Sequence, residues 1–167
     1  PPNLVEGLLM LLNEYKGGIL EIECLSDKKK QDEPAFDYKD SVEAQRLTSK
    51  IVPMPDGDQL EVDIRLHLRA VVTELRCTQL DTVDKERKFA DQLASEITAN
   101  VDKIVDRLKK KKVDALGIGN RIYAKNPALW KRWKDDWDDI FANARFHVKT
   151  EVEIINTGTE EGKRLYP

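Results

Sequence analysis

The residues best suited to acid–base or metal chemistry are the two histidines, His67 and His147. Each falls on the charged, solvent-facing side of a predicted strand, without an evident buried carboxylate to orient its ring. If the two strands were neighbours, the histidines could approach one another and bind a metal ion, but a third ligand is missing. We therefore predict two surface histidines, with no catalytic residue, no metal site and no cofactor.

Carboxylates and thiols offer two further kinds of chemistry. The aspartates between residues 135 and 139 could supply oxygen ligands to a hard cation, yet on a helix they diverge around the axis, so a solvated face is predicted. The two cysteines, Cys24 and Cys77, match no metal-binding or redox spacing. Two buried or edge thiols are the favoured interpretation, and a single disulfide between them is the alternative.

A glycine-containing segment, Gly117-Ile118-Gly119, follows an apolar Leu116 in a way that suggests a phosphate-binding turn. A dinucleotide-binding fingerprint needs a strand before it, a third glycine and a helix directly after it, whereas here a lysine-rich helix end, residues 109–112, comes first. We predict that Gly117 stops that helix at positive φ and that Gly119 is close-packed backbone. The lysines suit the negative end of a helix dipole, and a phosphate or lipid head-group site is the alternative.

Further along, Asn126 and Pro127 are typical of an N-cap followed by proline at the first helical position. In one helix running from there to Phe141, all the large apolar side chains, including the three tryptophans, share an arc of about 120°. The stripe either packs on a sheet or is partly exposed to anchor another subunit. Stacking on nucleic acid is disfavoured because the helix carries as many acids as bases. The candidate interface residues are Gly117, Gly119, Trp130, Trp133 and Trp137.

Periodic patterns predict the elements that would position these residues. An alternation from Leu60 to Leu68 predicts a strand after a turn at residues 55–58, with a break in parity near residues 70–72 that suits either a bulge or a strand covered on both faces. An apolar stripe predicts a long helix over residues 84–111, and a second alternation predicts a last strand over residues 146–154, antiparallel to its neighbour. The earlier part predicts a helix over residues 4–15 ended by Gly17-Gly18, a strand over 19–24, an exposed loop over 26–34 and a strand from Phe36 through Tyr38, Val42 and Ala44 to about Thr48.

Length and composition place limits on the fold. A chain of 167 residues, 40% hydrophobic and 35% charged with a net charge of −3, is typical of a soluble globular protein. The apolar run at residues 8–12 is far shorter than the roughly 20 residues of a transmembrane helix, and the first residues show no secretory signal. We predict one α+β domain over residues 1–158 and a flexible end over residues 159–167. Its mainly antiparallel, twisted sheet of about four strands packs against the long helix and the tryptophan helix.

Several of these motifs, taken in order, resemble one known family. Near the front, residues 6–9 (Glu-Gly-Leu-Leu), residues 16–20 (Lys-Gly-Gly-Ile-Leu) and Cys24 are similar to that family's glycine-glycine strand entry. The strongest match is Asp114-Ala115-Leu116-Gly117-Ile118-Gly119, then Pro127, Trp130 and Trp137, closing with Ile154 and Thr157-Gly158. The chain thereby resembles the last of the three α/β domains of the Ger(x)C proteins, the C subunits of germinant receptors in bacterial endospores.

The resemblance implies a role in spore germination. Ger(x)C proteins carry a signal peptide and a lipobox cysteine, so the lipid anchor is expected to precede this fragment, and the expected location is the outer surface of the spore inner membrane. The expected partners are the two integral-membrane subunits of the receptor, of the A and B type, without nucleic acid. The expected function is receptor assembly or signal transmission by protein–protein contact, without catalysis. The alternative is direct binding of a small-molecule germinant in a pocket of this domain.

Overall fold

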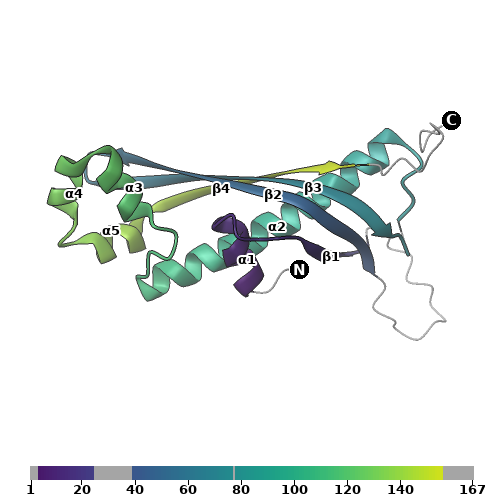
Figure 1. Ribbon diagram of the computed structural model, residues 1–167, viewed down its shortest axis with the longest axis horizontal. Helices are drawn as coiled ribbons and strands as arrows, with labels where there is room; N and C mark the ends of the chain where they lie inside the picture. The colour runs from purple at the N-terminus through teal and green to yellow at the C-terminus, as the bar shows by residue number, and fades with distance from the viewer. Residues whose placement is uncertain (1–3, 25–38, 77, 156–167) are drawn as a thin grey trace.

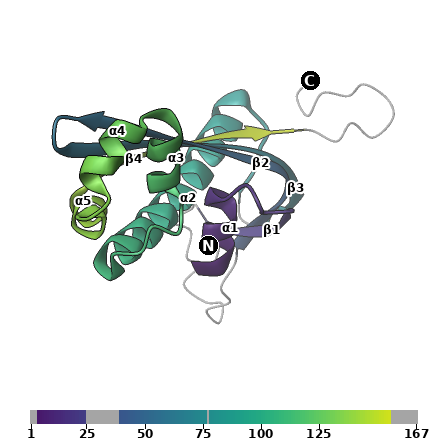
Figure 2. The same cartoon turned by 60° about the vertical axis from the view of Figure 1, so that its left-hand side comes forward.

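The computed structural model describes residues 4–24, 39–76 and 78–155, and it has the predicted α+β architecture (Figure 1). Within these ranges four strands form one sheet in the order β1-β2-β3-β4. Helices α1 and α2 pack on the sheet, and three shorter helices gather at one end of it, around the turn between β2 and β3 (Figure 2). The elements are α1 (Leu4–Leu11), β1 (Gly18–Glu23), β2 (Lys39–Asp56), β3 (Gln59–Glu74), α2 (Val83–Lys111), α3 (Ile118–Lys125), α4 (Pro127–Trp133), α5 (Trp137–Asn143) and β4 (Arg145–Ile154).

Strand β3 runs through the centre of the core, and its predicted alternation is confirmed. Its alternate apolar side chains from Leu60 to Leu68 are at most 3% exposed. The charged residues between them lie on the opposite face of the sheet. Burying one such apolar side chain contributes roughly 1.5–3 kcal/mol, so β3 supplies a large part of the hydrophobic stabilisation.

Strand β2 continues to Asp56, well beyond the end predicted near Thr48. The pairing with β3 passes from Ala44 opposite Ala70 to Arg46 opposite Arg69, which leaves one extra residue on β2 as a β-bulge. Before the bulge the buried apolar side chains are at even positions, and after it they are at odd positions, Leu47 and Ile51. The change of parity hid the second half of this strand from a simple period-two pattern.

Beyond Ala44, the edge of β2 no longer pairs with β1, and an asparagine and two prolines occupy it. The Asn13 side chain donates to the carbonyl oxygen of Ser49 at 2.8 Å and accepts from its backbone N–H at 2.6 Å, so that backbone faces away from β3. Pro53 and Pro55 are at odd positions like Ser49, and the register with β3 does not shift between them. The side of each proline that lacks an N–H group therefore faces the open edge, and no hydrogen bond to β3 is lost. Such an edge is a poor template for another strand.

The last strand, β4, runs parallel to β3, and the prediction of an antiparallel neighbour is wrong. From the end of β3, the 29-residue helix α2 covers about 43 Å at 1.5 Å per residue and returns the chain to the end where β3 began. Arg145 therefore pairs with Glu61 at the starts of both strands. A strand–helix–strand connection of this length brings strands in parallel, and an outer face of charged residues is compatible with either direction.

The long helix α2 packs on the last strand of the sheet and forms a second layer. Helix α2 has nearly the predicted bounds, and Thr82 caps its start by accepting a hydrogen bond from the backbone N–H of Lys85 at 3.3 Å. Its buried stripe runs from Phe89 to Val105 and packs on β4. The Thr98 hydroxyl donates to that of Thr150, which is 8% exposed, at 2.8 Å. The predicted inward and outward faces of β4 are both confirmed.

The first helix ends earlier than predicted, at Leu11, because Asn13 adopts a left-handed φ of 60°. Gly17 then has a φ of 118°, and a Cβ atom there would lie 2.8 Å from the carbonyl oxygen of Ala44, so only glycine fits this entry to β1. Cys24, directly after β1, is disulfide-bonded, so the favoured interpretation of this residue as a free thiol is wrong. The predicted loop at 26–34, the first residues of the second predicted strand, Cys77 and the C-terminal end lie outside the described residues.

The predicted single tryptophan helix is two helices. Asn126 caps α4 as expected, since its side-chain oxygen accepts from the N–H of Leu129 at 3.0 Å. The chain then leaves the helix at residues 134–136 and begins α5 at Trp137. The projection onto one helix was therefore wrong after Trp133, although the turn still brings the later aromatic residues back to the earlier ones.

Candidate interaction site

Helices α3, α4 and α5 form a unit that we call the helical cap, and a carboxylate organises its start. Asp114 accepts hydrogen bonds from the backbone N–H of Ile118, at 2.9 Å, and of Gly119, at 2.7 Å. Two N–H groups at the beginning of α3, which have no partner within the helix, are thereby satisfied. This role of Asp114 escaped the sequence analysis, and its only signal was an acidic residue shortly before a helix start.

Gly117 has the predicted positive φ, 66°, but its role differs from the prediction. It is the N-cap residue of α3, whereas α2 already ends at Lys111 and is followed by its C-cap residue, Lys112, which adopts a left-handed φ of 53°. The sequence pattern did not separate the end of α2 from the start of α3, whose cap residues are five positions apart. The lysine run therefore does lie at the end of α2, and within it Lys109 stacks over the Phe146 ring with its Nζ 5.8 Å from the centroid.

Gly119 is close-packed, as predicted. A Cβ atom at this position would lie 2.8 Å from two ring carbons of Trp130 and 3.1 Å from a ring carbon of Trp137. A larger residue could therefore be accepted only if a ring moved. The glycine therefore sets how closely α3 approaches α4 and α5.

A chain of aromatic contacts links the cap to the sheet. Trp130 and Trp137 meet edge to face, with ring centroids 5.2 Å apart. Trp137 lies 6.2 Å from Phe141, and Phe141 lies 5.9 Å from Phe146 of β4, at 82° between the ring planes. Aromatic pairs of this kind each add about 0.5–1.5 kcal/mol beyond simple burial. The aromatic chain thus fixes the position of the cap on the end of the sheet.

The five candidate interface residues differ in how far they reach the surface. Trp133 is 4% exposed, and Gly119 is also buried, so both belong to the core. Gly117, Trp130 and Trp137 are half-buried, with part of each residue at the surface. Of the predicted stripe, only the Trp130–Trp137 pair therefore combines a large aromatic surface with access to a partner.

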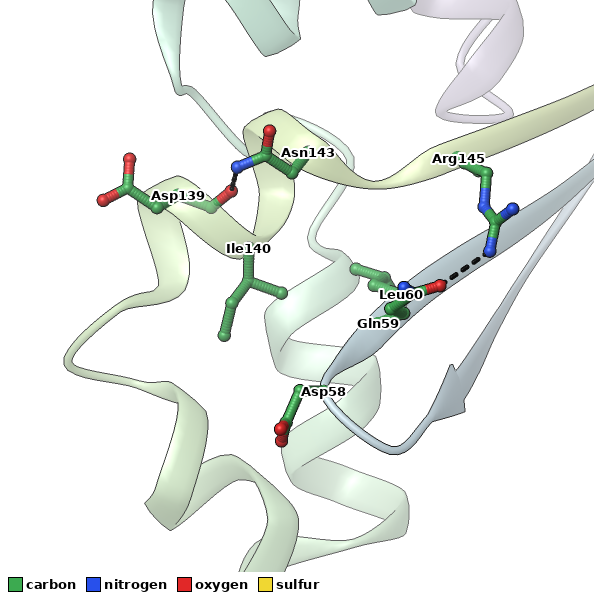
Figure 3. A pocket seen from close by; sticks show the side chains of 7 residues that line it. All are labelled: Asp58, Gln59, Leu60, Asp139, Ile140, Asn143 and Arg145. Carbon is green, nitrogen blue, oxygen red and sulfur yellow. Dashed lines mark hydrogen bonds between the residues drawn. The ribbon is translucent and has the colours of Figure 1, made fainter.

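Two cavities flank the β2–β3 turn where it meets the cap. The first, of about 380 Å³, lies between the turn and α5 (Figure 3). In it Arg145 donates to the side chain of Gln59 at 2.7 Å, and Asn143 donates to the carbonyl oxygen of Asp139 at 2.9 Å. The Asp139 carboxylate itself pairs with Lys112. Because these polar groups are already bonded to one another, this cavity is the weaker candidate for a ligand.

The second cavity, of about 400 Å³, lies between the same turn and helices α3 and α4, and we call it the basic cavity. Three cationic side chains line it, namely Arg121, Lys125 and Arg132, and no acidic side chain does. Ile122 and Leu129, 3% and 6% exposed, supply part of its apolar lining. The sequence analysis missed it; its only local signal was an α3 that carries two cations one turn apart and no acid.

A third cavity, of about 470 Å³, lies on the open face of the sheet, where two pairs of the lining charges contact one another. The Arg65 guanidinium contacts Asp63 at 2.9 Å, and the Lys149 ammonium contacts Glu151 at 2.8 Å. The hydrogen bond from Lys149 and its charge lower the pKa of the exposed Glu151 carboxyl. Arg65 and Lys149 are thus paired with acids, while Lys50 takes part in no ion pair within the described residues.

The histidines are on the surface, on the strands where they were predicted. Strands β3 and β4 are neighbours, but His67 pairs with Glu151 and His147 pairs with Asp63. The two rings are thus four positions apart in register, about 13 Å at 3.3 Å per residue, and His147 instead lies 3.4 Å from Glu61. Across residues 4–24, 39–76 and 78–155, no three side chains of the His, Cys, Asp or Glu type gather in a way that could hold a metal ion.

These features define a class of protein: a mixed α+β domain with a half-exposed aromatic pair and a basic cavity on one end of its sheet. None of the helices in the described ranges is long and apolar enough to cross a membrane. The family model described as "Spore germination B3/ GerAC like, C-terminal" matches residues 2–158, and the chain belongs to this family. The expected family and fold class are both confirmed.

Relatives agree with this assignment. The chain is 30% identical over 161 residues to spore germination protein YndF of Bacillus subtilis, covering 92% of this chain and 36% of that protein. It is 27% identical over 124 residues to spore germination protein KC of the same organism, covering 72% and 30%. The crystal structure of the GerBC protein matches 92% of this chain and 45% of its own, with a TM-score of 0.74 at 19% identity, which establishes a shared fold. The chain thus spans about a third of the length of the two Bacillus proteins.

Proposed function

We propose that this domain acts in spore germination as a non-catalytic part of a nutrient germinant receptor, in receptor assembly or signal transmission. The observation that carries the proposal is the Trp130–Trp137 pair, large aromatic rings that are fixed by the cap and half open to solvent. Tryptophan is among the residues that contribute most to protein–protein interfaces. The aromatic chain from this pair to β4 supplies a packed route from a contact on the cap to the sheet.

The proposal extends to location and partners. As one domain over residues 1–158, with the remaining residues as a flexible end, it would be carried by a lipid anchor at the outer surface of the spore inner membrane. Its partners would be the integral-membrane A-type and B-type subunits. The family to which the chain belongs, and the names of the Bacillus relatives, support this placement.

Co-purification with the membrane subunits tests the proposed assembly role, using two variants matched on the same helix. Trp130→Leu removes a half-exposed indole and Trp133→Leu removes a buried one, so both weaken packing but only the first changes the surface. At a temperature well below both melting temperatures, we expect Trp130→Leu to reduce recovery of the receptor complex. Trp133→Leu should leave recovery near that of the wild-type protein.

Equal recovery for the two variants would remove the tryptophan pair from the interface. Direct binding of a small-molecule germinant is the second candidate function, and the cavities beside the β2–β3 turn favour it. If an amino-acid or sugar germinant at millimolar concentration raised the melting temperature of the chain, and both leucine variants kept full recovery, direct binding would replace assembly as the better account.

A further inference from the structure

We propose that the basic cavity binds a small organic anion, with a carboxylate or phosphate group on a compact apolar body. The inference goes beyond the assembly role and rests on a different part of the cap. Its basis is the concentration of three cations, Arg121, Lys125 and Arg132, around one cavity of a chain whose net charge is −3.

The three cations are distinguished by their shared position. Among the described residues, no ion pair or side-chain hydrogen bond involves any of them; the same holds for Arg46 and Lys50 on β2, but only these three line one cavity without an acidic lining residue. Arg121 and Lys125 are also one turn apart on α3, where like charges repel. An anion bound between them and Arg132 would relieve that repulsion and use donors that are otherwise directed only to water.

The rest of the lining indicates an organic ligand. The buried residues Ile122 and Leu129 line the cavity together with the cations, and Pro53 and Pro55 line it from β2. An apolar body could rest on these side chains while its charged group meets the cations. The volume of about 400 Å³ is within the usual range for small-molecule sites.

One further donor lies in the same cavity. The oxygen of the Asn126 side chain is occupied as the N-cap of α4, accepting from Leu129, which orients the amide nitrogen as the remaining donor. An arginine fork can hold a carboxylate or phosphate through two parallel bonds, and such charge-assisted bonds are stronger than neutral ones. The cavity thus combines charge, directional donors and an apolar surface.

Titration of the 167-residue chain with matched probes, followed by backbone amide NMR shifts, tests the proposal. Benzoate is compared with benzamide, which has the same shape without the charge, and phenyl phosphate with inorganic phosphate. We expect saturable shifts at α3, α4 and the β2–β3 turn with benzoate and phenyl phosphate. Benzamide should give none, and inorganic phosphate should bind more weakly than its phenyl ester because it lacks the apolar body.

Charge variants on one helix complete the test. Arg132→Gln removes a cation that lines the cavity, and Lys131→Gln removes the neighbouring exposed cation that does not. We expect Arg132→Gln to weaken benzoate binding by at least about tenfold, the loss of one charged hydrogen bond, and Lys131→Gln to change it by less than about twofold. Both variants should melt close to the wild-type temperature, since both side chains are exposed.

Three outcomes would overturn the proposal: equal shifts with benzoate and benzamide, an equal loss of affinity in the two glutamine variants, or no saturation with either organic anion. Binding only to phosphatidylglycerol vesicles, in a flotation assay that Arg132→Gln abolishes, would assign the cations to a membrane surface and also overturn it. None of these results depends on co-purification with receptor subunits, so the anion site and the assembly role succeed or fail separately.

Discussion

The sheet and the helical cap at one end of it are stabilised by different kinds of contact. Along most of its length the sheet is a regular ladder with an alternating buried face, covered by the continuous apolar stripe of α2. The helical cap instead depends on a few specific contacts: the Asp114 carboxylate, the glycine at 119 and the aromatic chain. The ladder spreads its stabilisation over many similar side chains, whereas the cap concentrates it in a few. The cap is therefore where single substitutions should have local effects.

The largest expected change in the free energy of unfolding comes from removing one buried side chain from the cap and one from the ladder. We expect Trp133→Ala in the cap to lower the free energy of unfolding by about 3–5 kcal/mol and Leu66→Ala in β3 by about 2–5 kcal/mol. Hydrogen exchange of the two variants checks the comparison. Trp133→Ala should speed exchange mainly in α3–α5, while Leu66→Ala should speed it throughout. Uniform loss of protection in both variants would show that the cap and ladder unfold as one unit.

Cys24, which is disulfide-bonded, directly follows β1. Strand β1 pairs with the start of β2, at the end of the ladder opposite to the β2–β3 turn and the cap (Figure 1). Since the chain has one other cysteine, Cys77, an intrachain bond would close a long loop, and such bonds typically contribute about 2–4 kcal/mol. We expect Cys24→Ser to lower the denaturant midpoint by a corresponding amount and to leave exchange in the cap nearly unchanged. A reducing agent should reproduce the effect in the wild-type protein and have none in the variant.

Gly119→Ala tests the close approach of α3 to the tryptophans. Alanine is normally better than glycine inside a helix by about 1 kcal/mol, so the intrinsic change favours the variant. We nevertheless expect a loss of about 1–3 kcal/mol in the free energy of unfolding, because the new methyl group meets the Trp130 ring. In the double variant with Trp130→Leu, the loss caused by Gly119→Ala should largely disappear. Purely additive effects would show that the ring is not what excludes the methyl group.

The smallest expected effect concerns the ion pair that joins the two regions, Lys112 at the end of α2 and Asp139 of α5. The hydrogen bond to Asp139 and its charge raise the pKa of the exposed Lys112. The stabilisation is therefore fully present below the ordinary lysine pKa of about 10.4 and is lost as the pH rises through the raised value. We expect Asp139→Asn to lower the melting temperature slightly at pH 7 and Asp138→Asn to lower it less. Both differences should shrink in about 1 M salt, and salt-independent differences would point to packing.

The regular half of the molecule could be predicted from the sequence because its patterns are local. The alternation in β3 and β4 and the stripe of α2 are repeated over many residues, so each element was identified with nearly correct bounds. The predictions that were wrong concerned β2 and the tryptophan helix, where a single local irregularity interrupts the pattern. One bulge after Ala44 reversed the parity of β2, and one short turn at residues 134–136 divided the tryptophan helix. A period-based pattern cannot anticipate a single inserted residue.

The candidate sites were even harder to predict from the sequence, because they are assembled from residues that are far apart along the chain. Gly119 and Trp130 were identified as notable residues, yet which tryptophans are buried was decided by how the short helices pack against one another and on the sheet. The basic cavity gathers Arg121 and Lys125 from α3, Arg132 from α4 and apolar side chains from β2, which are far apart along the chain. Asp114 was noted only as part of a motif, because its bonds to two backbone N–H groups depend on how the chain turns.

The sequence by itself determined the family, the α+β class and which face of β3, α2 and β4 is buried, since these depend on residue types and on periods repeated over many residues. The tertiary structure alone decided the parallel pairing of β3 with β4, the aromatic chain and the cluster of uncompensated cations. These depend on the return path of α2 and on the packing of short helices around a turn, where contacts between distant residues choose among arrangements that are locally equivalent.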